Sequence, residues 1–425
     1  MCHNMFAMTC NPVRRAARLR RRARHRGAAA APALLLALAC TGGAQEPISN
    51  LVISSDPELA ELAAALLPDI AARSGLELRE PVRLERRSRE ELVRYLEYKL
   101  DAELPEAEAK AMVSAYALLG LVPHSLDLRE VLLSLYTEQV AGFYEPDSTA
   151  LFVMDDQPEM DVQGLLVHEL VHAVQDQWFD LDALTDSDLG NDRAAAAQAA
   201  IEGHATLVMF EFMAEQATGA PVDLGQLPDF AAQLRPALEG MRTQFPALAG
   251  APAVIQEALL FPYLEGAGYV LRLWAAGNRV APFGDFLPAS TEQIVLLGGS
   301  APPVELSVSV TGGRLVHEDV LGHLELSIFL QEHVGAASAS LADGWAGDRY
   351  VLVETASGDL GLVWQVIWDD AVARDGFADA LDGALNSLGG PATLERTDIE
   401  GRPATQLSIG ITEGVSVVTV LDRER

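Results

Sequence analysis

A pentapeptide in the middle of the chain combines two histidines and a glutamate at a spacing that suits metal chemistry. It reads His168-Glu169-Leu170-Val171-His172. Residues four apart lie on the same face of an α-helix, so His168 and His172 can present two imidazole nitrogens to one metal ion, with Glu169 beside them. The pattern indicates zinc-dependent hydrolysis in which Glu169 acts as the base.

A third ligand must come from elsewhere, because a catalytic zinc ion typically takes three protein ligands and keeps a fourth position for water. Glu202 and His204 are the candidates on a predicted downstream helix. They are roughly 200° apart around that helix, so both cannot face the metal. Apolar neighbours place Glu202 on the buried side and His204 on a polar side. We expect one Zn²⁺ held by His168, His172 and Glu202, with His204 exposed or contacting a ligand.

The charge that develops on the substrate oxygen needs a further donor besides the metal. Tyr263 is the first candidate, because Phe261-Pro262-Tyr263 interrupts a predicted helical region and the tyrosine could extend into a cleft. An aromatic residue beside proline more often packs in a core, so that alternative stays open. Tyr144 and His204 are the other candidates, and Tyr144 is also a candidate for substrate contact.

Three predicted elements position these residues. The motif lies in a helix from Val162 to Trp178, and Asn191 or Asp192 can cap a second, alanine-rich helix that runs to about Glu215. Before the motif, Gly142 to Val153 places aromatic and β-branched residues around a Pro-Asp-Ser turn, which predicts a β-hairpin. One of its strands could be a sheet edge that pairs with an extended substrate, and an ordinary hairpin is the equal alternative.

The remaining patterns predict an α+β protein. Capping residues and helical spacing indicate helices over residues 57–135, with a strand near 80–84. Beyond about residue 315, helical runs (321–334, 375–388) alternate with strand-like runs (349–354, 360–367, 414–421), which is typical of a small α+β domain. We expect four parts: a signal peptide with the start of a linker (1–44), a helical N-terminal region (45–135), a zinc catalytic domain (136–310) and a C-terminal α+β domain (311–425).

The first 44 residues have the features of an export signal. Eight arginines lie within residues 14–26, and a short apolar stretch at 28–39 precedes Cys40. That stretch is too short to span a bilayer. Cys40 resembles the lipid-acceptor cysteine of bacterial lipoproteins, although their signals usually have leucine where this chain has Ala37. We expect an exported protein of the cell envelope or periplasm, lipid-anchored through Cys40, with free secretion as the alternative.

The acidic balance of the chain excludes some partners. The formal charge is −31, and because the first 44 residues hold eight basic and no acidic residues, the rest has 22 basic and 61 acidic residues, or −39. So negative a body repels nucleic acids and anionic lipid headgroups. The expected partner is a protein or peptide substrate, with membrane contact only through the lipid anchor.

The stretch from His168 to Asp176, H-E-L-V-H-A-V-Q-D, resembles the motif helix of the gluzincins, the thermolysin-like zinc peptidases of clan MA. Their third ligand is a glutamate on a second helix. The resemblance implies a helix-rich, zincin-like catalytic region with the ligands and base given above, and a supporting role for Asp176. Those enzymes place an aspartate four residues after the glutamate, where this chain has Thr206, so Asp176 or Thr206 would have to support a histidine.

A second resemblance covers most of the chain after the signal. It is to a group of largely uncharacterised bacterial proteins classed as metallopeptidases, many of them predicted lipoproteins. It implies the fold and the zinc ion but not the substrate. Besides the motif, it rests on Gly142-Phe143-Tyr144, Ile201-Glu202-Gly203, Phe261-Pro262-Tyr263 with Gly266, Ser290-Thr291-Glu292-Gln293, and Gly344-Trp345 with Gly347-Asp348-Arg349-Tyr350.

Three functions stay open at this point. The first is peptide-bond hydrolysis in the cell envelope by glutamate-assisted attack of zinc-bound water. The second is a catalytically silent, zinc-containing lipoprotein that binds or assembles a partner. The third is hydrolysis of a non-peptide amide by the same ligands. Glu169 favours an enzyme, because a binding module has no need of a base beside the metal.

Overall fold

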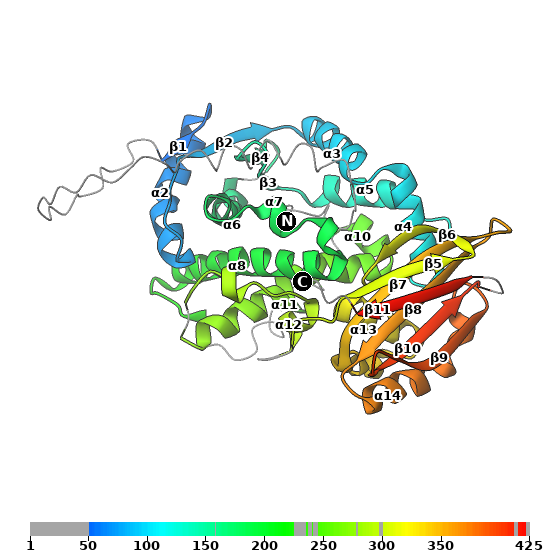
Figure 1. Ribbon diagram of the computed structural model, residues 1–425. Coiled ribbons are helices and arrows are strands. Elements are labelled where there is room, and N and C mark those ends of the chain that lie inside the picture. Colours follow the sequence, from blue (N-terminus) through cyan, green and yellow to red (C-terminus); the bar gives the residue numbers. More distant parts are fainter. Residues whose placement is uncertain are drawn as a thin grey trace, which may run out of the picture.

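The computed structural model describes residues 51–157, 159–224, 235–236, 240, 245–277, 279–296, 301–411 and 415–421. The export signal, with Cys40, lies outside the described residues. The described chain is an α+β protein, as predicted: a helix-rich region carries a four-stranded sheet, and a strand-rich region lies at the C-terminal end (Figure 1). Within these residues, no helix is both long and apolar enough to cross a membrane.

The strands of the four-stranded sheet precede the motif in the chain. Its order is β1-β2-β4-β3, in which β1, β2 and β4 are parallel and β3 is antiparallel to β4. The predicted hairpin is therefore β3 and β4, and β3 is an edge strand. The bounds are β1 (Val52–Ile53), β2 (Val82–Arg87), β3 (Gly142–Glu145) and β4 (Ala150–Met154).

The helices of this region begin where local sequence signals predict. The Asp56 side chain accepts hydrogen bonds from the first amides of α2, and Ser88 and Glu91 form a capping box at the start of α3. The elements are α2 (Pro57–Ser74), α3 (Arg89–Glu103), α4 (Glu106–Leu118), α5 (Leu128–Gln139), α6 (Glu159–Asp176), α7 (Leu181–Leu184), η1 (Ser187–Leu189), α8 (Asn191–Thr218), α10 (Pro246–Gly250), α11 (Ala253–Ala275), η3 (Gly284–Phe286) and α12 (Thr291–Val295).

The two longest of these helices, α8 and α11, cross in backbone contact at a pair of glycines. A Cβ atom on Gly203 would lie 2.1 Å from the carbonyl carbon of Gly266, so neither position has room for a side chain. The prediction that Pro262 interrupts a helix is wrong, because α11 continues through it. Proline removes one backbone hydrogen bond, and the packing of α11 on α8 outweighs that loss.

The C-terminal region is built on a five-stranded antiparallel sheet of order β6-β7-β8-β10-β9, with β5 and β11 paired separately. The central strand β8 is apolar and buried on both faces, between α14 on one side and the valines of β5 and β11 on the other. The elements are β5 (Leu306–Thr311), β6 (Gly313–Asp319), α13 (Gly322–His333), η4 (Ala336–Gly344), β7 (Trp345–Thr355), β8 (Leu360–Trp368), α14 (Ala371–Asp382), η5 (Leu385–Ser387), β9 (Ala392–Ile399), β10 (Arg402–Ile409) and β11 (Ser416–Leu421).

Candidate metal centre

Helices α6 and α8 bring His168, His172 and Glu202 together. Nε2 of His168 lies 3.0 Å from Oε2 of Glu202 and 3.1 Å from Nε2 of His172, and the third side of this triangle, from His172 Nε2 to Glu202 Oε2, is 3.4 Å. Ligands of a tetrahedral zinc ion with bonds of about 2.0–2.1 Å are roughly 3.3 Å apart. The triangle therefore has the size that one such ion requires, and it is the one group of three or more candidate ligands among the described residues.

The cluster is nearly inaccessible to solvent, with exposed fractions of 5% for His168, 0% for His172 and 1% for Glu202. Burial lowers the pKa of His168, which keeps the ring neutral and able to bind a metal. Burial by itself raises the pKa of Glu202, but the two histidines, His172 foremost, bring it well below its usual range. An ionised carboxylate between two ring nitrogens is a suitable donor set for a divalent cation such as zinc.

A chain of hydrogen bonds sets the tautomer of His172. The amide nitrogen of Gln175 donates to the carbonyl of Ile201 (3.1 Å), which can only accept, so the amide oxygen faces His172. Nδ1 of His172 lies 2.8 Å from that oxygen and must therefore carry the proton. Its Nε2 then presents a lone pair toward His168 and Glu202, which is the form that binds a metal.

The same amide nitrogen extends the chain to His204. It lies 3.0 Å from Nδ1 of His204, which therefore accepts, and Nε2 of His204 then donates to the carbonyl of Ser74 (3.1 Å). Burial lowers the pKa of His204 to about 3, so the ring is neutral, as this arrangement requires. Three helices, α2, α6 and α8, are thus connected from a backbone carbonyl to a candidate metal ligand.

The prediction that His204 lies on a polar side of its helix is wrong, because its exposed fraction is 0%. Helix α8 packs against α2, α6, α11 and α12, so its central turns have little solvent-facing side. Glu211, two turns further on, is also buried and forms an ion pair with Arg279. His204 contacts Gln175 rather than the candidate ligands themselves.

Asp176 and Thr206 are the two residues expected to support a histidine. Asp176 accepts hydrogen bonds from the Tyr144 hydroxyl (2.9 Å) and the Leu181 amide (3.3 Å). Thr206 is buried, and its hydroxyl has no hydrogen-bond partner in the described part of the chain. Gln175 bonds to His172 and was missed from the sequence. Its place three residues after His172, on the same helix face, was the available signal.

The edge strand β3 holds the carboxylate of Glu169. The backbone N–H of Tyr144 donates to Oε2 of Glu169 (3.0 Å), since this amide points away from β4 and toward α6. Glu169 has an exposed fraction of 0% and directly follows a candidate ligand in the chain. The side chain of Tyr144 is itself buried against Asp176, so any contact of this residue with substrate would be made by the backbone of β3.

Tyr263 and Gln198 lie on the α11 side of the cluster. The Tyr263 ring centroid is 6.2 Å from that of His168. The amide nitrogen of Gln198 donates to Oε1 of Glu202 (2.9 Å) from one helical turn earlier on α8. Gln198 was also missed from the sequence, and its i,i+4 spacing to Glu202 could have indicated it. Of the three predicted oxyanion donors, Tyr144 and His204 bond to Asp176 and Ser74, and Tyr263 stands beside a candidate ligand.

Comparison with known proteins bears on the C-terminal region alone. Residues 309–422, which are 114 of the 425 residues, match the model of a domain family of unknown function, DUF8575. The match does not include the residues of the metal cluster. Among curated proteins and among solved structures, none matches the chain.

Proposed function

We propose that the protein is a zinc metallopeptidase that hydrolyses peptide bonds in the cell envelope. The buried cluster of His168, His172 and Glu202 carries this proposal, because its ligand atoms lie at the separations of a tetrahedral zinc site. Glu169 supports a catalytic rather than a structural ion, since a carboxylate next to a ligand is the base that hydrolysis needs. A closed structural site typically has four protein ligands, and among the residues that the structure describes this cluster has three.

When bound, zinc would polarise the scissile carbonyl and make a water molecule more acidic. Glu169 would take the proton of the attacking water and pass it to the leaving amine. The backbone amide of Tyr144 would hold that carboxylate in place, since it donates to Oε2 of Glu169. The hydroxyl of Tyr263 would donate a hydrogen bond to the developing oxyanion. The edge strand β3 would pair with the extended backbone of the substrate through backbone groups other than the Tyr144 amide, which Glu169 occupies.

The test combines metal analysis with activity. The mature protein should contain about one zinc ion per chain and cleave an unstructured protein such as casein. Glu169→Gln should retain the zinc and lose cleavage, whereas Glu202→Ala should lose both. Glu97→Gln, at an exposed position of α3, is the matched control and should change neither. A wild-type protein that binds zinc but cleaves no member of a peptide library would instead be a zinc-containing binding or assembly protein.

We further propose that the protein is exported and anchored by a lipid on Cys40. The support is the order of features in the sequence, in which an arginine-rich segment and a short apolar stretch precede this cysteine. Expressed with its signal, the wild-type protein should partition into the detergent phase and Cys40→Ser into the aqueous phase. Identical partition of the two proteins would rule out the lipid anchor.

A further inference from the structure

The two carboxylate oxygens of Glu202 have different partners. Oε2 lies 3.0 Å from Nε2 of His168 and 3.4 Å from Nε2 of His172. Oε1 instead accepts a hydrogen bond from the amide nitrogen of Gln198, at 2.9 Å. Because Glu202 is buried, solvent does not compete for these positions. Gln198 therefore separates the oxygen that faces the histidines from the oxygen that does not.

The bond to Glu202 sets the orientation of the Gln198 amide. Gln198 is buried, and within the described residues its Oε1 has no hydrogen-bond partner. The opposite orientation would place this oxygen against the ionised carboxylate of Glu202, which can only accept. A buried oxygen without a partner costs free energy, so an apolar side chain would be less costly at this position. The hydrogen bond to Glu202 is the contribution that the amide makes.

The crossing of α8 and α11 fixes the backbone beside both residues. Gly203, which follows Glu202, lies in backbone contact with Gly266 of α11. Gly266 also lies against Ala199, which follows Gln198, and a Cβ atom on Gly266 would be 2.1 Å from the Ala199 carbonyl oxygen. Because this packing holds both turns of α8 in place, the side-chain conformation of Glu202 decides which of its oxygens faces the histidines.

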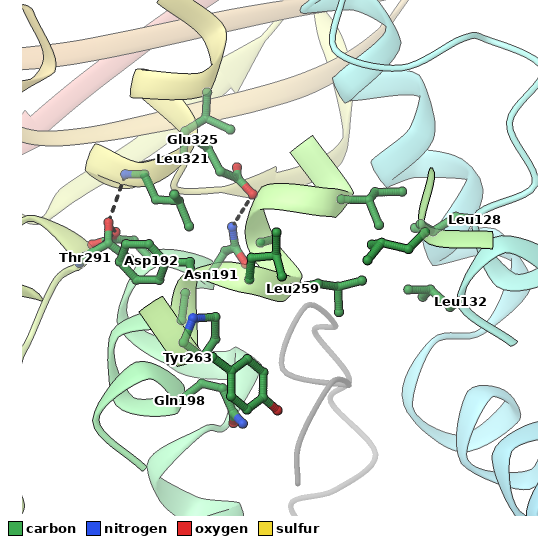
Figure 2. Close-up of a pocket in the computed structure, with 18 of the residues that line it drawn as sticks. Leu128, Leu132, Asn191, Asp192, Gln198, Leu259, Tyr263, Thr291, Leu321 and Glu325 are labelled. Carbon is green, nitrogen blue, oxygen red and sulfur yellow. Dashed lines mark hydrogen bonds between the residues drawn. The ribbon is translucent and has the colours of Figure 1, made fainter. Parts of the chain in front are cut away.

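Gln198 also lies at the border of an apolar cavity. The cavity has a volume of about 100 Å³ and lies between α5, α8, α10, α11 and α13, and Gln198 and Tyr263 are among the residues that line it (Figure 2). Much of the wall is aliphatic, with Leu259 and Ile255 on α11. A methionine at position 198 would continue this wall, so the amide can be removed without placing a new polar group or a bulkier side chain there.

We propose that Gln198 is a positioning residue that makes Glu202 bind the metal through Oε2 alone. A carboxylate can bind a metal ion through one oxygen or through both. With Oε1 held by Gln198, the two histidines and Oε2 supply three ligand atoms and leave the fourth tetrahedral position open, as catalysis requires. Without that bond, Oε1 would be a buried, unpaired oxygen beside a cation and would bind it as well. The inference rests on the metal centre of the proposed function, but not on peptidase activity.

The coordination number of bound cobalt tests this proposal without any turnover. Co²⁺ in place of zinc absorbs visible light more strongly with four ligand atoms than with five, because its absorption depends on geometry. Cobalt-loaded Gln198→Met should therefore absorb more weakly than the wild type and should bind the metal at least as tightly. Gln198→Leu should show the same loss of absorption and replaces the first variant if that one does not fold. Gln216→Met, at an exposed position of α8, is the matched control and should keep the wild-type spectrum.

A wild-type cobalt spectrum in both Gln198 variants would overturn the inference, because Glu202 would then bind through one oxygen without the amide. Weaker metal binding in both variants would also overturn it, since Gln198 would then hold the site together rather than set the coordination number. If the wild-type protein itself binds no cobalt, the metal centre fails and the inference fails with it. If the protein binds the metal but cleaves no peptide, only the peptidase function fails. Where the wild type does cleave peptides, Gln198→Met should lower kcat 10- to 100-fold at nearly unchanged KM.

Discussion

Gln175→Met is the substitution that tests the metal centre most directly. It keeps the length and nearly the volume of the side chain but removes an acceptor and a donor from the buried chain of hydrogen bonds. Nδ1–H of His172 loses its acceptor, and Nδ1 of His204 and the carbonyl of Ile201 lose their donor. His172 is then free to turn or to place its proton on Nε2, the nitrogen that must be unprotonated to bind a metal.

The expected magnitude follows from these contacts. Loss of the partner that orients a metal-binding histidine typically weakens metal affinity 10- to 100-fold, so the zinc dissociation constant of Gln175→Met should rise by about that factor. Each buried polar group left unpaired costs about 1–3 kcal/mol. The Ile201 carbonyl keeps its partner within helix α8, so two groups are left unpaired, Nδ1 of His172 and Nδ1 of His204. The free energy of unfolding of the metal-free protein should therefore fall by about 2 kcal/mol or more.

Zinc affinity can be measured by competition with a chromogenic chelator, and stability by urea unfolding. Gln177→Met is the matched control, because Gln177 comes two residues after Gln175 and its side chain bonds, in the described part of the chain, to backbone atoms of Arg79 and Glu80. It should bind zinc as the wild type does. Wild-type affinity in Gln175→Met would refute the tautomer assignment, and an equal loss in both variants would point to general disruption of the end of α6.

Three further outcomes are expected. Gly203→Ala should destabilise the protein by at least about 1–3 kcal/mol in urea unfolding, because its Cβ would overlap the backbone of Gly266, whereas Gly383→Ala, which meets nothing, should be neutral. Burial raises the pKa of Glu325 to about 8 from 4.5, so the stability that this carboxyl contributes is fully present below pH 4.5 and is lost as pH rises through 8. In Glu325→Gln, the free energy of unfolding should therefore depend less on pH in that window. An unchanged pH dependence would contradict the assignment. Burial lowers the pKa of His172, but the Glu202 carboxylate raises it more, to a net value above 6.5. Because a proton on His172 competes with the metal, chelator titrations should show zinc affinity rising with pH through that pKa. If His172 is not a ligand, the titrations should show no such rise.

Much of the fold could be predicted wherever the signal is local. Ser88 and Glu91 mark the start of α3 because a capping box involves only neighbouring residues. Strand β8 is recognisable because a continuous apolar run suits a strand covered on both faces. In contrast, β9 was not predicted, since it is a sheet edge on which charged and apolar residues alternate weakly. The prediction that the helix breaks at Pro262 was wrong, because α11 is stabilised by contacts with α8, whose residues are distant in the sequence.

The candidate site also has some features that follow from local sequence and others that depend on tertiary contacts. The sequence by itself determined that His168 and His172 share a face with Glu169 beside them, because helical periodicity is a property of neighbouring residues. It also indicated Glu202 as the third ligand, and the structure brings its carboxylate to both histidines. Only the tertiary structure decided what supports these ligands. The chain from Ser74 through His204 and Gln175 to His172 joins three helices, and its longest step spans 130 residues. The packing of α8 on several sides, which no local pattern encodes, buries His204 and makes that connection.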